Sequence, residues 1–282
     1  MHDGTYKVFV DFQRVADITQ IPPPVFRHMK RLKASRASSK KLPVVPVEFL
    51  KMSLHLELSH PMGYIERWQK LYPRMKKLYH HYPAKKCNKT LAATSQQDPQ
   101  RSIEKMLKTN HIVLAGFAAA RAYLPGVVVP FYEVIAKDPT TIINKAHTLV
   151  AGSTVEHIDQ SDGFLMPPAT VLKKANKVLL VAYPTSGCHA ITKTDDGFTV
   201  LSIDSLLMYE YAMVLTPNPI VPTKDTRCLI GKLVDAESKA DTTSGIFSRF
   251  TLECFGEQEG MRTIKEKRWL QKKAPSVYRR GG

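Results

Sequence analysis

The chain has 282 residues, which suits two modest domains or one domain with an elaborate extension, and its 43% of hydrophobic residues allows a packed core and excludes wholesale disorder. Its 41 lysines and arginines outnumber its 25 acidic residues, so the formal net charge is +16 and polyanions such as RNA, DNA or an acidic membrane surface are the expected partners. No apolar run reaches the roughly 18 residues of a spanning helix, and the N-terminus lacks the pattern of a signal peptide, so a membrane location is not expected.

The first hundred residues predict one strand and two helices. Apolar residues alternate over 6–12, which favours a short strand. Prolines at 22–24 end it, and residues 27–41 form a basic stretch without an acid. Pro46 is typical of the first turn of a helix, which we expect over about 47–59, and a second helix is expected over about 65–82.

The second helix has an apolar stripe and a basic face. Apolar residues recur every three or four positions, as in an amphipathic helix: Ile65, Trp68, Leu71, Tyr72, Met75, Leu78, Tyr79 and Tyr82. The other side carries Arg67, Lys70, Arg74 and Lys77. Trp68 belongs to the stripe and is expected in the core, not as a platform for a base. Pro73 is expected to kink or divide the helix.

The remainder predicts a compact α/β unit behind a polar linker at 85–99. Two regions follow from that boundary, 1–95 and 96–282. The expected helices are 99–108, 117–124, 139–150 with an Asp138 cap, and one that begins at a capping Asp204 and ends near 215. The expected strands are 112–114, 127–136, 178–183 and 198–201, with a turn at 195–197. The fold class is therefore α+β or α/β, with an N-terminal helical segment followed by a small mixed sheet.

Cysteine and histidine spacing indicates neither a metal site nor a disulfide framework. Cys87, Cys188, Cys228 and Cys254 contain no C-x-x-C pair, so we expect four reduced thiols in a reducing compartment. The adjacent His80 and His81 would point about 100° apart on a helix and make a poor chelate.

Three basic regions point to nucleic acid. They are 27–41, the basic face of the second helix, and the tail from Arg262 to Gly282, where Trp269 and Tyr278 are interleaved with the charges. Aromatic side chains among the charges favour single strands. For any one basic face, the alternative is that its charges are only solvated and bind no partner. Three such faces in one chain favour nucleic-acid binding over that alternative.

Catalytic patterns are missing from the sequence. Two-metal nucleotidyl transfer needs carboxylates that share ions, which on a strand means D-x-D, and the sequence contains none. Glu133 has no carboxylate two residues away and is best interpreted as a structural acid. Adjacent Cys188 and His189 rarely form a nucleophile–base pair. No catalytic residue and no metal ligand is therefore assigned.

The segment from Pro46 to Pro83 resembles the signature block of the poly(A) polymerases of large cytoplasmic DNA viruses. A methionine-serine, LELS-x-P and G-x-x-x-RW pattern recurs there. The matching residues are Lys51-Met52-Ser53, Leu56-Glu57-Leu58-Ser59, Pro61, Gly63, Arg67-Trp68 and Lys70. His60 and Tyr64 depart from the usual arginine and acid.

Later segments resemble the second, nucleotidyltransferase-like domain of the same family. Their markers are residues 113–118, 133–135, 138–139, 188, 202–207 and 253–256 through Arg268-Trp269. The family's catalytic domain, with its paired aspartates, precedes the signature block, so we expect this chain to lack it. The family adds poly(A) from ATP with Mg²⁺ or Mn²⁺ at that domain, and no cofactor is expected on this chain.

The resulting hypothesis is the RNA-binding and assembly portion of a viral poly(A) polymerase, not catalytic by itself. Phosphate contacts are assigned to Arg67, Lys70, Arg74, Lys77, Arg268 and Lys272. The partners are the single-stranded 3′ end of mRNA, a separate catalytic chain and a second copy in a homodimer, in the host cytoplasm or the virion. The alternative is a non-enzymatic viral packaging or scaffold protein, and an active site around Glu133 is a further rival.

Overall fold

The computed structural model describes residues 5–11, 13–19, 45–60, 65–85, 87, 98–159, 165–185, 187–215, 220, 223–249, 251 and 253–257. The basic stretch at 27–41 and the tail from 262 lie outside the described residues. At the N-terminus, β1 (Thr5–Val10) pairs antiparallel with β2 (Gln13–Thr19). The first strand is predicted by the sequence pattern, whereas the second is not.

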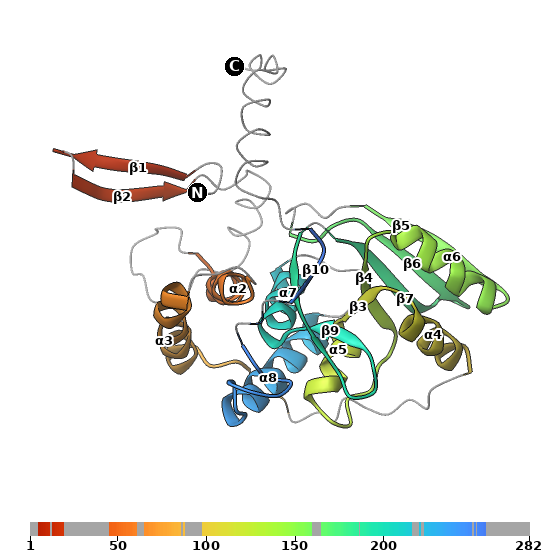
Figure 1. The fold of residues 1–282 in the computed structure, drawn as a ribbon. Helices are drawn as coiled ribbons and strands as arrows, with labels where there is room; N and C mark the ends of the chain where they lie inside the picture. Colours follow the sequence, from red (N-terminus) through yellow and green to blue (C-terminus); the bar gives the residue numbers. More distant parts are fainter. Residues whose placement is uncertain are drawn as a thin grey trace, which may run out of the picture.

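Both N-terminal helices are confirmed. α2 (Val47–Leu58) and α3 (Ile65–His81) share a small core of Leu58, Trp68, Leu71 and Met75. Trp68 is 4% exposed, as its place on the stripe predicts. α3 continues through Pro73, whose side chain is exposed. α2 also packs against α7 (Ile203–Leu215), which joins the helical pair to the rest of the molecule (Figure 1).

One mixed sheet forms the centre of the described molecule. Its order is β10-β8-β9-β3-β4-β7-β6-β5, with β3 parallel to β9 and β4 parallel to β7. The strands are β3 (Ile112–Ala115), β4 (Tyr132–Ala136), β5 (Ser153–Ile158), β6 (Ala169–Lys174), β7 (Lys177–Pro184), β8 (His189–Lys193), β9 (Thr199–Leu201) and β10 (Cys254–Phe255). Every residue of the two central strands β3 and β4 is buried.

Helices cover both faces of the sheet at β4. Neighbouring residues of a strand point to opposite faces. Tyr132 interacts with Glu104 of α4 (Asp98–Thr109), whereas the next residue, Glu133, accepts a hydrogen bond from Tyr209 of α7. α6 (Pro139–Leu149) packs beside α4, and α5 (Gly116–Tyr123) and α8 (Thr223–Lys239) pack with α7. The predicted mixed α+β fold class is therefore confirmed (Figure 1).

Several expectations about single elements are wrong. The strand expected over 127–136 begins only at Tyr132, and residues 127–131 pair with neither β3 nor β7; Pro130 among them has no backbone N–H to donate. Asp204 does not cap α7. Ser202 takes that place and accepts from the Ser205 backbone N–H at 3.4 Å, which leaves the Asp204 carboxylate for other partners. Strands β5, β6 and β8 and helix α8 have no counterpart among the expected elements.

Candidate nucleic-acid interface

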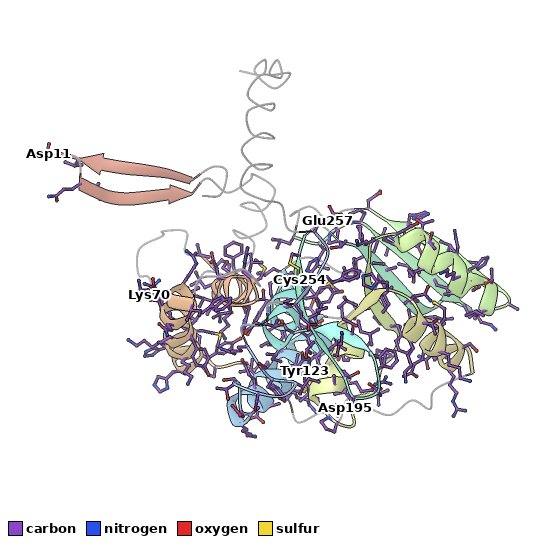
Figure 2. All side chains as sticks on the ribbon, viewed as in Figure 1. Asp11, Lys70, Tyr123, Asp195, Cys254 and Glu257 are labelled. Carbon is purple, nitrogen blue, oxygen red and sulfur yellow. A yellow bond between two sulfur atoms is a disulfide. The ribbon has the colours of Figure 1, made fainter. Side chains whose placement is uncertain are left out.

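Helix α3 separates its charged side chains from its apolar ones. Trp68, Leu71 and Met75 are buried against α2 and the body of the protein. Arg67, Lys70, Arg74 and Lys77 are all exposed, as the helical spacing predicts. Figure 2 shows Lys70 at the outer side of α3. These four residues therefore form one solvent-exposed basic surface on α3, which we call the α3 basic face.

The four cations of the α3 basic face are not equivalent. Arg67 makes an exposed ion pair with Glu57 of α2, with Nη2 and Oε2 at 2.6 Å. Lys70, Arg74 and Lys77 have no acidic partner among the described residues. They are better placed than Arg67 to meet phosphate, because Arg67 would first have to leave Glu57. Arg268 and Lys272 lie outside the described residues.

A buried polar cluster fastens α2 and α3 to α7 and α8. His55 of α2 is fully buried, with Nδ1 at 2.7 Å from Oδ1 of Asp204 and Nε2 at 2.8 Å from the Tyr79 hydroxyl. Arg249 ion-pairs with the other oxygen of Asp204 at 3.3 Å and with Glu237 of α8. We call these five residues the polar seam. Four separate elements and the segment after α8 meet in it.

Burial sets the charge state of the polar seam. Burial lowers the pKa of His55 below its usual range, although the hydrogen bond and charge of Asp204 oppose the shift. A neutral imidazole then donates from Nδ1 to Asp204 and accepts from Tyr79 at Nε2. One turn earlier, burial lowers the pKa of Lys51 to about 8, and its ammonium donates to the Tyr82 carbonyl.

The side chain of Glu133, a residue of β4, lies against the turn between β3 and α5. Gly116 has a φ of +57°, and a Cβ built there would lie 1.7 Å from Oε2 of Glu133. The carboxyl accepts from the Phe117 backbone N–H, and Oε1 accepts from Tyr209 at 2.9 Å. Burial raises the pKa of Glu133 to about 7, with both hydrogen bonds opposing the shift. The glutamate therefore fills the helix N-terminus, where an anion would otherwise bind.

Comparison with known proteins points to one family. Residues 1–64 match the sequence profile described as "Poly(A) polymerase catalytic subunit". A protein of Acanthamoeba polyphaga mimivirus named "Putative poly(A) polymerase catalytic subunit" is 27% identical over 112 residues, which are 39% of this chain and 18% of that protein. The crystal structure of the Megavirus polyadenylate synthase matches with a TM-score of 0.75 at 20% identity, over 96% of this chain and 61% of that chain.

The chain is thus similar in sequence to viral poly(A) polymerase catalytic subunits over part of its length, and similar in fold to the polyadenylate synthase. It spans less than two thirds of the length of either of these two proteins. The mixed sheet and its helices share the fold of the polyadenylate synthase.

The expectation of four reduced thiols is wrong. Cys87 is bonded to Cys228 of α8, and Cys188 is bonded to Cys254 of β10, with Cα–Cα distances of 5.1 and 5.4 Å. The partners are 141 and 66 residues apart, so only the fold brings them together. Gly231 assists the first pairing, since a Cβ there would lie 2.2 Å from the Lys85 carbonyl oxygen.

The remaining site assignments concern metals and membranes. Within the described ranges, no three histidine, cysteine or acidic side chains are grouped as a metal site would need. His80 and His81 lie on α3 with their ring planes at 78°. Among the same residues, no helix combines the length and the apolar character required to cross a bilayer.

Sequence reasoning missed the polar seam, because Arg249 and Asp204 carry no local pattern that would link them to His55.

Proposed function

We propose that the chain supplies the RNA-binding and assembly part of a viral poly(A) polymerase, which extends mRNA 3′ ends from ATP. The observation that carries this proposal is the α3 basic face. Lys70, Arg74 and Lys77 are exposed together, while the opposite side of the same helix is buried. Cations held on one rigid helix and lacking acidic partners can neutralise successive phosphates, and the release of counterions then drives binding.

The same proposal assigns nucleotidyl transfer to residues outside this chain. The sequence offers no D-x-D pair, and the one acid at the β3–α5 turn is committed to Tyr209 and Phe117. Glu133 is 2% exposed, so it cannot hold a metal ion together with a solvated nucleotide without rebuilding that turn. ATP and Mg²⁺ or Mn²⁺ then bind to a separate catalytic chain. The present chain forms a homodimer and assembles with that catalytic chain.

Charge reversal on α3 tests the RNA-binding role. The double variant Lys70→Glu/Arg74→Glu should weaken binding of a labelled single-stranded RNA by more than about tenfold in fluorescence anisotropy. The slope of log affinity against log salt should fall by about 1.4, which is about 0.7 for each phosphate that is no longer neutralised. The matched control is Arg101→Glu/Lys105→Glu, with the same charge change and spacing on the exposed side of α4. Equal effects of both variants, or no effect of the first, would refute the α3 basic face.

A poly(A) extension assay tests the non-catalytic role. The purified chain, an RNA primer, labelled ATP and either metal ion should give no extension, although the RNA is bound. Extension would show that the chain assembles a catalytic carboxylate pair. Duplex DNA bound as tightly as RNA would favour the packaging protein, which needs no preference for single strands.

A further inference from the structure

A hollow of about 560 Å³ lies beside the α3 basic face, and the proposed function does not use it. It is lined by Tyr72, Lys76 and His80 from α3, by Glu237 and Ser238 from α8, and by Arg249. Its volume is in the range of small-molecule sites, about 300–1,000 Å³. The hollow therefore has room for one nucleotide unit.

Arg249 forms a built floor for this hollow. Its side chain is 1% exposed, and its guanidinium carbon lies 4.4 Å from the centroid of the Tyr72 ring. Its ion pairs to Asp204 and Glu237 involve Nε and Nη2, whereas Nη1 has no partner among the described residues. All three guanidinium nitrogens are sealed from solvent, so the guanidinium lies behind the Tyr72 ring and is not itself open to the hollow.

The charges around the hollow select an uncharged ligand group for its interior. Two carboxylates already balance Arg249, and a third, Asp241, lies in the lining. Hydrogen bonds from Thr243 and Ser244 lower the pKa of Asp241 to about 2, so this carboxylate is ionised. A phosphate inside would meet these acids. A planar uncharged ring would instead meet the Tyr72 ring.

The rim of the hollow connects it to the α3 basic face. Residues of a helix are rotated by about 100° each, so Lys76, His80 and Lys77 lie about 40°, 80° and 140° from Tyr72 around α3. Lys70 follows at about 160°, which completes a path of cations from the hollow to the basic face. Lys76 has its ammonium 4.5 Å from the centroid of the Tyr72 ring, where it can move to a phosphate at the rim.

We propose that this hollow takes the base of one unpaired RNA nucleotide, which stacks on Tyr72. The proposal rests on RNA binding by the α3 basic face, and it adds that the strand is read as single-stranded. The phosphates on either side of the base lie against Lys76 and Lys77.

Blocking the hollow tests the proposal without disturbing the core. Ser238 is an exposed residue of the lining, so Ser238→Trp fills the hollow from α8. Its matched control is Lys239→Trp, the exposed neighbour outside the lining. Removal of one base–aromatic stack corresponds to roughly 5- to 150-fold weaker binding of single-stranded RNA. Tyr72→Ala should show the same weakening and Tyr72→Phe should not.

The salt dependence separates this proposal from the proposed function. Ser238→Trp and Tyr72→Ala should lower affinity with an unchanged salt slope, because they remove a stack and leave every phosphate neutralised as before. If Lys70→Glu/Arg74→Glu weakens RNA binding while Ser238→Trp does not, the hollow is refuted and the basic face stands. If the wild-type chain binds no RNA, the proposed function fails first.

A crosslinking experiment on the wild-type chain tests the proposed base site even if a variant fails to fold. RNA that carries 4-thiouridine is irradiated with the wild-type chain, and the crosslinked peptides are mapped by mass spectrometry. Crosslinks to residues 72–80 or 237–249 are expected, and crosslinks confined elsewhere would overturn the proposal. Free UMP or AMP that binds with the affinity of RNA and the same dependence on Tyr72 would identify a mononucleotide site and also overturn it.

Discussion

Replacing Glu133 by glutamine should remove a pH dependence of folding stability. Glutamine has the same shape, and it can keep both contacts of Glu133. Its carbonyl accepts from the Phe117 N–H, and its amide donates to the Tyr209 hydroxyl, which can also act as an acceptor. The variant therefore changes the cost of burying a charge and little else.

The magnitude follows from the raised pKa. Glu133 titrates near 7 in the folded protein, against 4.5 for an unburied glutamate. Each pH unit of that difference corresponds to about 1.4 kcal/mol, so ionising this group in the folded state costs about 3 kcal/mol. The folded state binds the proton more tightly, so this stability is fully present below pH 4.5 and is lost as the pH rises through 7. Glu133→Gln should therefore be more stable than wild type by a few kcal/mol at about pH 8.5 and equally stable near pH 4.5.

The assay is urea unfolding of both proteins at several pH values between about 4.5 and 8.5. The difference between the two free energies cancels the buried groups that do not interact with Glu133. It still includes Glu210, whose pKa is raised by burial and by the charge of Glu133, so the difference reports on this pair of carboxyls. His55 is one of the groups that cancel, and its lowered pKa costs stability only as the pH falls below its usual value near 6.5. Parallel curves for the two proteins would refute the assignment of a buried, titrating acid to this turn. RNA affinity should be the same in both.

Three further changes test other features. Gly116→Ala should lower the unfolding free energy by about 3–5 kcal/mol because of the clash and the positive φ, whereas Gly126→Ala, with open space at its Cβ, should cost about 1 kcal/mol in urea titrations. Cys228→Ser should cost about 2–4 kcal/mol, since it opens a loop of 141 residues, and a melting temperature equal to wild type under non-reducing conditions would contradict the bond to Cys87. Arg249→Leu should lower the unfolding free energy by about 3–5 kcal/mol, because it leaves two buried carboxylates without their cation. A decrease below about 1 kcal/mol in chemical denaturation would show that the polar seam does not stabilise the fold.

Features that depend on neighbouring residues could be predicted from the sequence. The stripe of α3 predicted both its buried side and its exposed cations. Asp138 before Pro139 predicted the start of α6, where the Asp138 carboxylate accepts from the Thr141 N–H at 3.1 Å. These signals are local because a helix satisfies its hydrogen bonds within a few residues.

Features that depend on distant residues could not be predicted. The extent of β4 is set by where β3 and β7 lie beside it, so β-branched residues before Tyr132 gave a false signal. Asp204 has the identity of a cap, but its partners come from α2 and from the segment after α8. The two cysteine pairs could not be predicted either, because the spacing of cysteines along the chain does not show which sulfur atoms lie close together in the fold.

The polar seam has a mechanical consequence. A flexible tether between α3 and the sheet would stretch under load and let the two move apart. Here a load on α3 passes through Tyr79 and His55 to Asp204 at the start of α7, and from there into the sheet. If RNA is bound at the α3 basic face, as proposed, a force on that RNA would be transmitted through these hydrogen bonds to α7 and the sheet, and α3 would not move independently of them.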